Sequence, residues 1–314
     1  AINSEKTYRK TPMIWLIGNK GMLGTELSET LSKRNLSFVG TDREVDITDP
    51  AALEAFAQNL AASGTPVTTI INCAAYTAVD KAEDDTELCA KLNVAGPANI
   101  ARLASNIGAE LLHISTDYVF NGNGSRPYRE DDPTDPTGVY GRTKRDGETE
   151  ALAANPRTWI IRTAWLYGRH GNNFVHTMLR LMAEKNELKV VNDQRGSPTW
   201  ARDLTNVIAD FIELSAKAAA PSYGIYHYSN EGNITWYDFA NEIYTQGVAS
   251  GELLDSRPFK LEPCTSAEFP AKVRRPPYSV LDKTKIAAVL ANGTGRAVPD
   301  WKTSLKAFMS ERRG

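Results

Sequence analysis

The amino-acid sequence predicts an α/β fold, a doubly wound parallel sheet with helices on both faces, followed by a smaller C-terminal part. Short apolar runs alternate with segments whose apolar residues recur at helical spacing, as in parallel sheets with crossover helices. A glycine-rich turn also joins the first apolar run to the first helical segment. This alternation loosens after Trp165, and prolines become frequent from Pro258 onward.

The strands of the predicted sheet are short apolar or β-branched runs, the composition of strands that are buried on both faces. They alternate with the predicted helices, so we expect neighbouring strands to run parallel. These strands are Met13–Ile17, Leu36–Gly40, Val67–Asn72, Ala109–Ile114 and Trp159–Arg162.

The helices between these strands are predicted from periodicity and capping residues. Leu23, Leu27 and Leu31 recur every four residues and therefore share one helix face. Asp49 and Pro50 form a helix start, with Asp as the N-cap and Pro at the first helical position. Two further helices are predicted over Leu92–Ile107 and Tyr140–Ala154.

The C-terminal part is predicted to be a small, irregular cap over the carboxyl edge of the sheet, where ligands bind in such folds. We assign residues 1–12 to a leader, 13–165 to the dinucleotide-binding domain with returning segments around 188–222, and 166–187 with 223–314 to the cap. The helices predicted after Trp165 are Asn172–Glu184, Ala201–Ala216, Trp236–Tyr244, Leu281–Leu290 and Trp301–Met309, and the strands predicted there are Leu188–Asn192 and Tyr223–Ser229.

The composition excludes several classes of protein. The formal net charge of the 314 residues is −2, so the chain does not suit a protein that neutralises many nucleic-acid phosphates. No apolar run approaches the roughly 20 residues that span a bilayer. Three widely spaced cysteines and four histidines without a His-x-x-x-His pair predict neither a disulfide framework nor a metal site. We therefore expect a cytoplasmic globular protein.

The glycine-rich turn predicts a dinucleotide site of the Rossmann type. Gly18, Gly21 and Gly24 would permit a tight turn and a close approach of the backbone to a pyrophosphate. The helix that follows would offer unpaired N–H groups to that anion. The spacing is one residue longer than the common G-x-G-x-x-G pattern. At the end of the second strand, Asp42 would favour NAD and Arg43 would favour NADP, so both cofactors stay open.

A second pattern predicts oxidoreductase chemistry. Tyr140 and Lys144 lie four residues apart and would share one helix face, where the ammonium would lower the pKa of the phenol. The phenol could then deliver or remove a proton at a carbonyl or alcohol. Thr116, at the predicted carboxyl end of a strand, could bind the same substrate oxygen. Pro136 makes a helix start just before Tyr140 plausible.

The chain resembles the extended short-chain dehydrogenase/reductases, and within them most closely the dTDP-4-dehydrorhamnose reductase family. The resemblance covers almost the whole chain from Met13 onward. It rests on residues 72–83, 92–94, 115–120, 139–144, 162–168, 171–174 and 192–199. It implies hydride transfer from NADPH or NADH to C4 of a dTDP-linked 4-keto-6-deoxy sugar, which would give dTDP-L-rhamnose. Tyr140 would protonate the oxygen, Thr116 would orient it, and Lys144 would tune Tyr140 and hold the ribose.

The resemblance also implies two sets of binding residues. The cofactor would be held by Gly18, Lys20, Gly21, Met22, Leu23, Gly24, Asp42, Arg43, Asp46, Ile47, Cys73, Ala74, Ala75, Tyr76 and Asn93, together with Tyr140 and Lys144. The dTDP-sugar would contact Thr77, Val79, Thr116, Asp117, Tyr118, Trp165, Asn173, Arg195 and Arg275. Core packing remains an alternative for Trp165, and a solvated turn remains one for Arg274 and Arg275.

The chain departs from the family in ways that bear on its assembly. Some family members form a dimer through a divalent metal bound by glutamates. Glu26 fits one such position, but Arg202 stands where a second acid is expected, so we predict no metal site. A homodimer without metal is left open. Tyr76 stands where some relatives carry histidine, which we interpret as neutral.

Two alternatives to this function stay open. The first is a different nucleotide-sugar 4-ketoreductase, or an epimerase, on the same scaffold, because the shape of the pocket sets the sugar stereochemistry. The second is a non-catalytic regulatory subunit of the kind that binds methionine adenosyltransferase. Intact Thr116, Tyr140 and Lys144 favour catalysis over that regulatory role.

Overall fold

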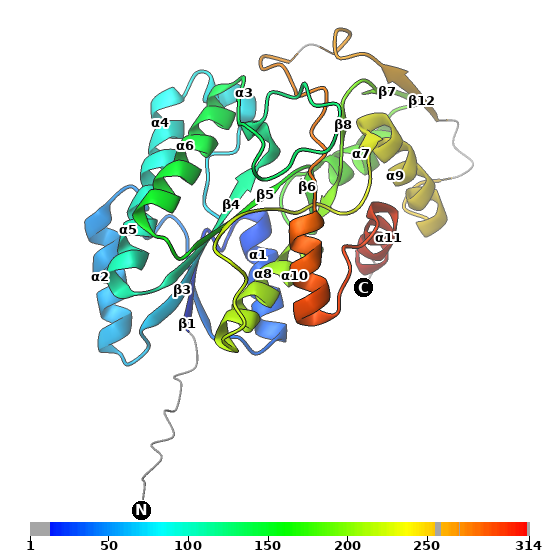
Figure 1. The fold of residues 1–314 in the computed structure, drawn as a ribbon. Coiled ribbons are helices and arrows are strands. Elements are labelled where there is room, and N and C mark those ends of the chain that lie inside the picture. The colour runs from blue at the N-terminus through cyan, green and yellow to red at the C-terminus, as the bar shows by residue number, and fades with distance from the viewer. Residues whose placement is uncertain (1–12, 255–258, 270, 313–314) are drawn as a thin grey trace, which may run out of the picture.

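A computed structural model describes residues 13–254, 259–269 and 271–312 of the chain. The predicted leader, residues 1–12, lies outside the described residues. Figure 1 shows a layered α/β molecule with a second group of elements on the side of the sheet where the strands end. The predicted doubly wound parallel fold is confirmed.

The centre of the described chain is a six-stranded sheet in the order β10-β5-β4-β3-β1-β2 (Figure 1). Every neighbouring pair in it is parallel. Its strands are β1 (Met13–Ile17), β2 (Phe38–Thr41), β3 (Val67–Asn72), β4 (Glu110–Thr116), β5 (Thr158–Thr163) and β10 (Gly224–His227).

Two apolar layers cover the sheet. On one face, α1 (Met22–Lys33), α8 (Ala201–Ala216) and α10 (Thr284–Thr294) pack against the strands. The buried side chains of this layer include Leu23, Leu27 and Leu31, as their spacing predicts. On the other face lie α2 (Pro50–Ala62), α5 (Gly96–Ile107) and α6 (Val139–Ala154). Asp49 caps α2 as predicted, because its Oδ1 accepts the N–H of Ala51 at 2.9 Å.

The helix predicted from Leu92 starts earlier and is interrupted. After the short α3 (Val79–Ala82), α4 (Thr86–Ala90) leads into a π-helical turn (Lys91–Ala95) and then into α5. Such turns widen a helix locally and occur often at functional sites. Here the turn contains the fully buried Asn93, one of the predicted cofactor residues.

A third apolar cluster organises the C-terminal part. It joins α7 (Phe174–Glu184), α9 (Trp236–Ser250) and α11 (Trp301–Glu311) to β7 (Glu187–Val191). β7 pairs in parallel with β12 (Lys260–Cys264). Two more short pairs lie at the carboxyl edge of the main sheet: β6 (Leu166–Tyr167) with β9 (Thr199–Trp200), and β8 (Arg195–Gly196) with β11 (Ile234–Thr235).

Three sequence expectations need correction. β10 belongs to the main sheet beside β5, although residues from 223 onward were expected in the cap. β7 lies outside that sheet, although residues from 188 were expected to return to it. The helix expected from Leu281 begins at Thr284, because Leu281 forms a bridge with Tyr128. The division into two domains stays a prediction, with β10 now assigned to the dinucleotide-binding domain and β7 to the cap.

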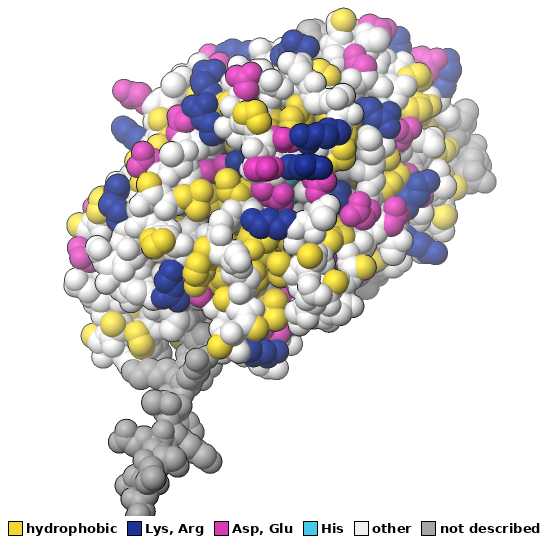
Figure 2. Space-filling view, in the orientation of Figure 1, with side chains coloured by type: hydrophobic (Ala, Val, Ile, Leu, Met, Phe, Trp, Pro, Cys, Tyr) yellow, Lys and Arg dark blue, Asp and Glu magenta, His cyan; other side chains and the backbone are white. Residues whose placement is uncertain are grey.

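Figure 2 shows basic and acidic side chains interspersed over one face of the molecule, without a broad field of one sign. This distribution agrees with the small net charge. In the described part of the chain, no helix is both long and apolar enough to cross a membrane.

Candidate active site

The glycine-rich turn brings the start of α1 close to the end of β3. Gly18 has a φ of +80°, a left-handed conformation that favours glycine. A Cβ atom on Gly18 would lie 2.7 Å from the nitrogen of Ala74. A Cβ atom on Gly24 would lie 2.0 Å from the carbonyl oxygen of Gly18, so only glycine permits this packing. Gly21 is the N-cap of α1, and Met22 and Leu23 begin the helix.

The end of β2 contains one group that sequence reasoning missed. Glu44 accepts the N–H of Asp42 at 3.0 Å and forms an ion pair with Lys20 at 3.2 Å. Hydrogen bonds from the backbone, followed by the Lys20 contact, lower the pKa of the Glu44 carboxyl. Glu44 therefore adds an anion beside Asp42 and Arg43, the residues expected to select between NAD and NADP.

Two further predicted cofactor residues have structural partners near β2. The Oδ1 atom of Asp46 accepts both the N–H and the hydroxyl of Thr48 at 2.8 Å. Ile47 is buried in the core, and its δ1 carbon would lie 2.6 Å from a Cβ added at Gly96. Its side chain thus closes the space beneath the π-helical turn.

The predicted cofactor residues after β3 are fixed by two asparagine side chains. Asn72 Oδ1 accepts the N–H of Ala74 at 3.0 Å, which turns the backbone away from the strand. Asn93 holds Tyr76 at both ends, because its Oδ1 accepts the Tyr76 N–H at 2.8 Å and its Nδ2 donates to the Tyr76 carbonyl at 3.0 Å. Cys73 and Ala75 lie in this loop and are half-buried.

Thr116 and Tyr140 meet at the carboxyl end of β4. Thr116 is the last residue of β4, and Tyr140 is the second residue of α6, which begins close to the expected position. Both side chains are buried, and the Thr116 side chain lies close enough to the phenol to affect its pKa. The Tyr118 ring packs edge-on against Tyr140 with centroids 5.5 Å apart. The two predicted groups are thus directed to one point.

The pKa of Tyr140 differs from the expectation. Burial raises the pKa of its phenol well above the ordinary value, and the neighbouring Thr116 side chain opposes only part of this change. The ammonium of Lys144 was expected to lower it. Instead, Lys144 Nζ donates to the carbonyl of Ile114 at 2.7 Å and lies 3.3 Å from Nε2 of His113. Burial lowers the pKa of Lys144 to about 8.

Asp117 adds a buried carboxyl beside this pair. The Thr116 hydroxyl donates to Asp117 Oδ1 at 3.0 Å. Burial raises the pKa of Asp117 to about 6, although hydrogen bonds from Thr116 and Ser279 oppose the shift. Asp117 therefore titrates closer to neutral pH than an exposed aspartate does.

A cavity of about 1080 Å³ opens next to these groups. Four predicted substrate residues line it: Asp117, Tyr118, Trp165 and Arg275. Trp165 stacks on Trp236 with ring centroids 3.6 Å apart, which forms a flat aromatic wall. Sequence reasoning missed Trp236, because a tryptophan at the first position of a helix carries no signal for a cavity.

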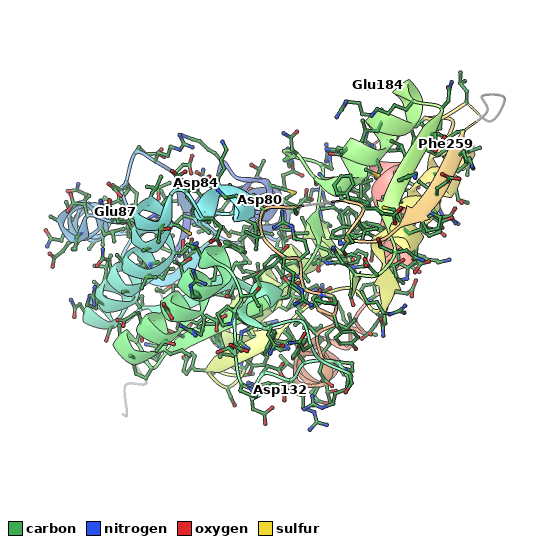
Figure 3. The ribbon with its side chains drawn as sticks, turned by 90° about the horizontal axis from the view of Figure 1, so that it is seen from above. Asp80, Asp84, Glu87, Asp132, Glu184 and Phe259 are labelled. Atoms are coloured by element: carbon green, nitrogen blue, oxygen red, sulfur yellow. The ribbon has the colours of Figure 1, made fainter. Side chains whose placement is uncertain are left out.

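Arg275 lies where the C-terminal part approaches α3. Its Nη2 atom lies 2.6 Å from Asp80 Oδ2, and Asp80 Oδ1 accepts the N–H of Val273 at 3.1 Å. Lys272 forms a second ion pair with Asp84. Figure 3 shows Asp80 and Asp84 together, on the side of the molecule away from Glu184 and Phe259. Arg275 Nη1 is buried and has no hydrogen-bond partner among the described residues.

Five predicted substrate residues do not line the cavity, and one of them, Thr116, lies beside it at the end of β4. Asn173 caps α7, and its Nδ2 donates to the carbonyl of Gly168 at 2.8 Å. Arg195 donates to the Asn233 side chain at 2.9 Å. Thr77 is exposed, and Val79 packs against the cluster that contains Tyr140. A sugar bound within this cavity would therefore not touch these side chains unless it extended beyond the cavity lining.

The position of Glu26 and Arg202, where we predicted no metal, holds an arginine between acids. Arg202 pairs with the fully buried Glu26 and lies 3.5 Å from Glu29 and 3.3 Å from Glu311. The guanidinium pairs with these carboxylates and places a positive charge between them, so they do not fit a divalent cation. In the described part of the chain, no three His, Cys, Asp or Glu side chains are grouped to hold a metal.

The parallel sheet, the glycine turn and the Thr–Tyr–Lys arrangement define a dinucleotide-dependent oxidoreductase. The family model described as the RmlD substrate binding domain matches residues 12–313, and the chain belongs to this family.

Three relatives illustrate the similarity. The chain is 43% identical over 274 residues to a dTDP-4-dehydrorhamnose reductase of Streptomyces griseus, covering 86% of each chain. It is 42% identical over 299 residues to a probable dTDP-4,6-dihydroxy-2-methyloxan-3-one 4-ketoreductase of Streptomyces antibioticus, covering 94% of each. A crystal structure of the Bacillus anthracis dTDP-4-dehydrorhamnose reductase in complex with NADP is 34% identical with a TM-score of 0.84, covering 96% of this chain and 99% of the other.

Proposed function

We propose that the protein reduces the 4-keto group of dTDP-4-dehydro-L-rhamnose with NADPH or NADH and releases dTDP-L-rhamnose. The observation that carries the proposal is the pair of buried side chains Thr116 and Tyr140 beside a cavity large enough for a nucleotide sugar. The names of the relatives from Streptomyces griseus and Bacillus anthracis support the choice of reaction.

Tyr140 is suited to give a proton to the new alkoxide. Its raised pKa keeps the phenol protonated at neutral pH, and a protonated acid is what a reduction consumes. The nicotinamide cofactor would supply the hydride to C4. The Thr116 hydroxyl, which donates to Asp117 in this structure, would turn to donate its hydrogen bond to the same oxygen. The phenolate of Tyr140 would then recover a proton from solvent.

The remainder of the ligand would lie along the cavity. The Trp165–Trp236 wall would cover an apolar face of the sugar ring, while Tyr118 and Asp117 would approach its hydroxyl edge. The unpartnered Nη1 of Arg275 would bind a diphosphate oxygen. The glycine turn and the start of α1 would hold the cofactor pyrophosphate.

Turnover tests this proposal most simply. The purified protein is mixed with dTDP-4-dehydro-L-rhamnose and either NADPH or NADH, and cofactor oxidation is followed by absorbance. We expect oxidation with a new C4 proton signal in the product NMR spectrum. The ratio of kcat/KM for the two cofactors decides between them.

The outcomes also separate the alternatives. Faster reduction of another dTDP-linked 4-keto sugar would favour a different nucleotide-sugar 4-ketoreductase. The name of the Streptomyces antibioticus relative suggests such a function. Epimerisation without net cofactor oxidation would favour an epimerase. Cofactor binding without any turnover would favour a regulatory subunit. A cytoplasmic location and a homodimer remain part of the proposal and would be tested by fractionation and light scattering.

A further inference from the structure

His113 is a buried histidine that the proposed reaction does not use. It lies on β4, three residues before Thr116, and its side chain is fully buried. Its Nε2 atom lies 3.3 Å from Lys144 Nζ, and its Nδ1 atom lies 3.0 Å from Asn72 Nδ2. Asn72, His113 and Lys144 thus form a continuous polar chain beneath the proposed catalytic centre.

The proton positions along this chain follow from one backbone group. The N–H of Ala74 can only donate, so the Asn72 atom that it contacts at 3.0 Å must be the amide oxygen. The amide nitrogen of Asn72 consequently faces His113, and Nδ1 of the ring must accept. A neutral imidazole has one N–H, and here it must lie on Nε2.

This tautomer directs a donor at Lys144. The Nε2–H bond points to Nζ, which also donates to the carbonyl of Ile114 at 2.7 Å. An ammonium has three donors and no lone pair, so its contact with Nε2–H would set two donors against each other. A neutral amine offers a lone pair to Nε2–H and still donates to Ile114.

We propose that Asn72 and His113 are positioning residues that hold Lys144 and destabilise its ammonium, so that Lys144 exchanges a proton near neutral pH instead of remaining a fixed cation. The inference about Lys144 stands on this hydrogen-bond chain, and only its effect on turnover rests on the proposed function. Lys144 would alternate between ammonium and amine by exchange with solvent water, with no change in oxidation state.

The groups around Lys144 agree with this assignment. Burial lowers the pKa of Lys144 to about 8, while Glu148 on α6 and the thiols of Cys73 and Cys89 oppose the shift. Tyr140 lies one turn away on α6 and is protonated near neutral pH. Burial is the main cause that lowers the pKa of His113 well below its ordinary value, so the ring stays neutral.

The first test observes the ring directly. The holoprotein is labelled with ¹⁵N-histidine, and two-bond ¹H–¹⁵N spectra assign the tautomer of each of its four histidines. We expect His113, identified by its loss in His113→Gln, to remain in the Nε2–H form between about pH 5 and pH 9, where an ordinary histidine titrates. An Nδ1–H form, or a ring that protonates in this range, overturns the proposal.

Asn72→Asp reverses the polarity of the chain without changing its shape. A carboxylate would accept from both Ala74 N–H and Nδ1–H, and the Nε2 lone pair would then accept from the Lys144 ammonium. We expect the Nδ1–H tautomer of His113 in the spectrum. In the pH profile of kcat/KM, we expect the fall on the basic side to move upward by about one pH unit or more. A shifted tautomer with an unmoved basic limb contradicts the role assigned to Lys144.

Asn155→Asp is the matched control. Asn155 is also buried. Its Oδ1 accepts the N–H of Arg157 at 3.0 Å, and its Nδ2 donates to the carbonyl of Ala109 at 3.2 Å. Its change should leave the His113 tautomer and the pH profile unaltered. If Asn72→Asp fails to fold, His113→Leu gives a second test, because it removes the Nε2–H donor that opposes the Lys144 ammonium, and the basic limb of the kcat/KM profile should then rise. An unmoved limb in that variant overturns the proposal.

Discussion

The indole rings of Trp165 and Trp236 stack with their centroids 3.6 Å apart, and together they form one wall of the cavity. Trp165 has a φ of +47°, a left-handed conformation that is strained for a side chain of this size. A Cβ atom on Gly196 would lie 2.5 Å from its ring, so the indole is held between Gly196 and Trp236. Such strain persists only where the surroundings fix it, which is common at ligand sites.

Trp236→Leu should weaken sugar binding more than it slows the reaction. The substitution removes the support of the Trp165 ring but touches neither Thr116 nor Tyr140. We expect KM for the nucleotide sugar to rise by about tenfold, the scale of one aromatic contact, with a smaller change in kcat. Trp236→Phe keeps an aromatic face and should lie close to wild type. Equal loss in both variants would refute the stacking role.

Arg275→Gln should weaken the affinity for the nucleotide diphosphate. Its buried Nη1 is the guanidinium atom available to a phosphate oxygen, since Nη2 pairs with Asp80. We expect the Kd of dTDP, measured by calorimetry, to rise about tenfold or more for loss of a charge-assisted hydrogen bond. Arg274 is exposed at the same rim, and Arg274→Gln should have a smaller effect. The reverse order would assign the phosphate to Arg274.

Arg202→Ala should destabilise the fold. It leaves the fully buried Glu26 without its cationic partner, and breaking such a pair costs about 3–5 kcal/mol. Urea denaturation measures the loss. Arg180→Ala removes an exposed pair with Glu184 and should cost no more than about 0.5 kcal/mol. A loss for Arg202→Ala as small as that of the control would contradict the buried ion pair.

Asp117→Asn should stabilise the protein at neutral pH and less so in acid. The pKa of Asp117 is raised to about 6 in the fold, so the folded state favours the protonated acid. Stability from this group is therefore present below the unfolded pKa of about 4 and is lost as pH rises through about 6. The gain in Tm for Asp117→Asn should thus be larger at pH 8 than at pH 4. An equal gain at both values would contradict the shift.

Much of the fold is predictable from periodicity because buried strands and amphipathic helices carry local signals. The spacing of Leu23, Leu27 and Leu31 predicts α1, and Asp49 with Pro50 predicts the start of α2. Strand membership is not local. The run at Gly224–His227 joins the main sheet only because it meets β5, which lies more than 60 residues earlier in the chain.

Some residues of the candidate site are predictable from the sequence and others are not, for the same reason. Thr116, Tyr140 and Lys144 are predictable from their spacing and from the expected ends of β4 and α6. Glu44, His113 and Trp236 are not, because each acquires its role from a partner distant in space. The pKa of Tyr140 also escapes prediction: sequence shows that a lysine is near but not that the phenol is buried.

The comparison of wild type with Tyr140→Phe tests the central claim most directly. Both proteins are first shown to bind NADPH with similar Kd, and cofactor oxidation is then followed with dTDP-4-dehydro-L-rhamnose. Loss of the phenol hydroxyl should lower kcat by at least about 100-fold, the contribution of a positioned general acid. Turnover within a few-fold of wild type would show that Tyr140 does not deliver the proton.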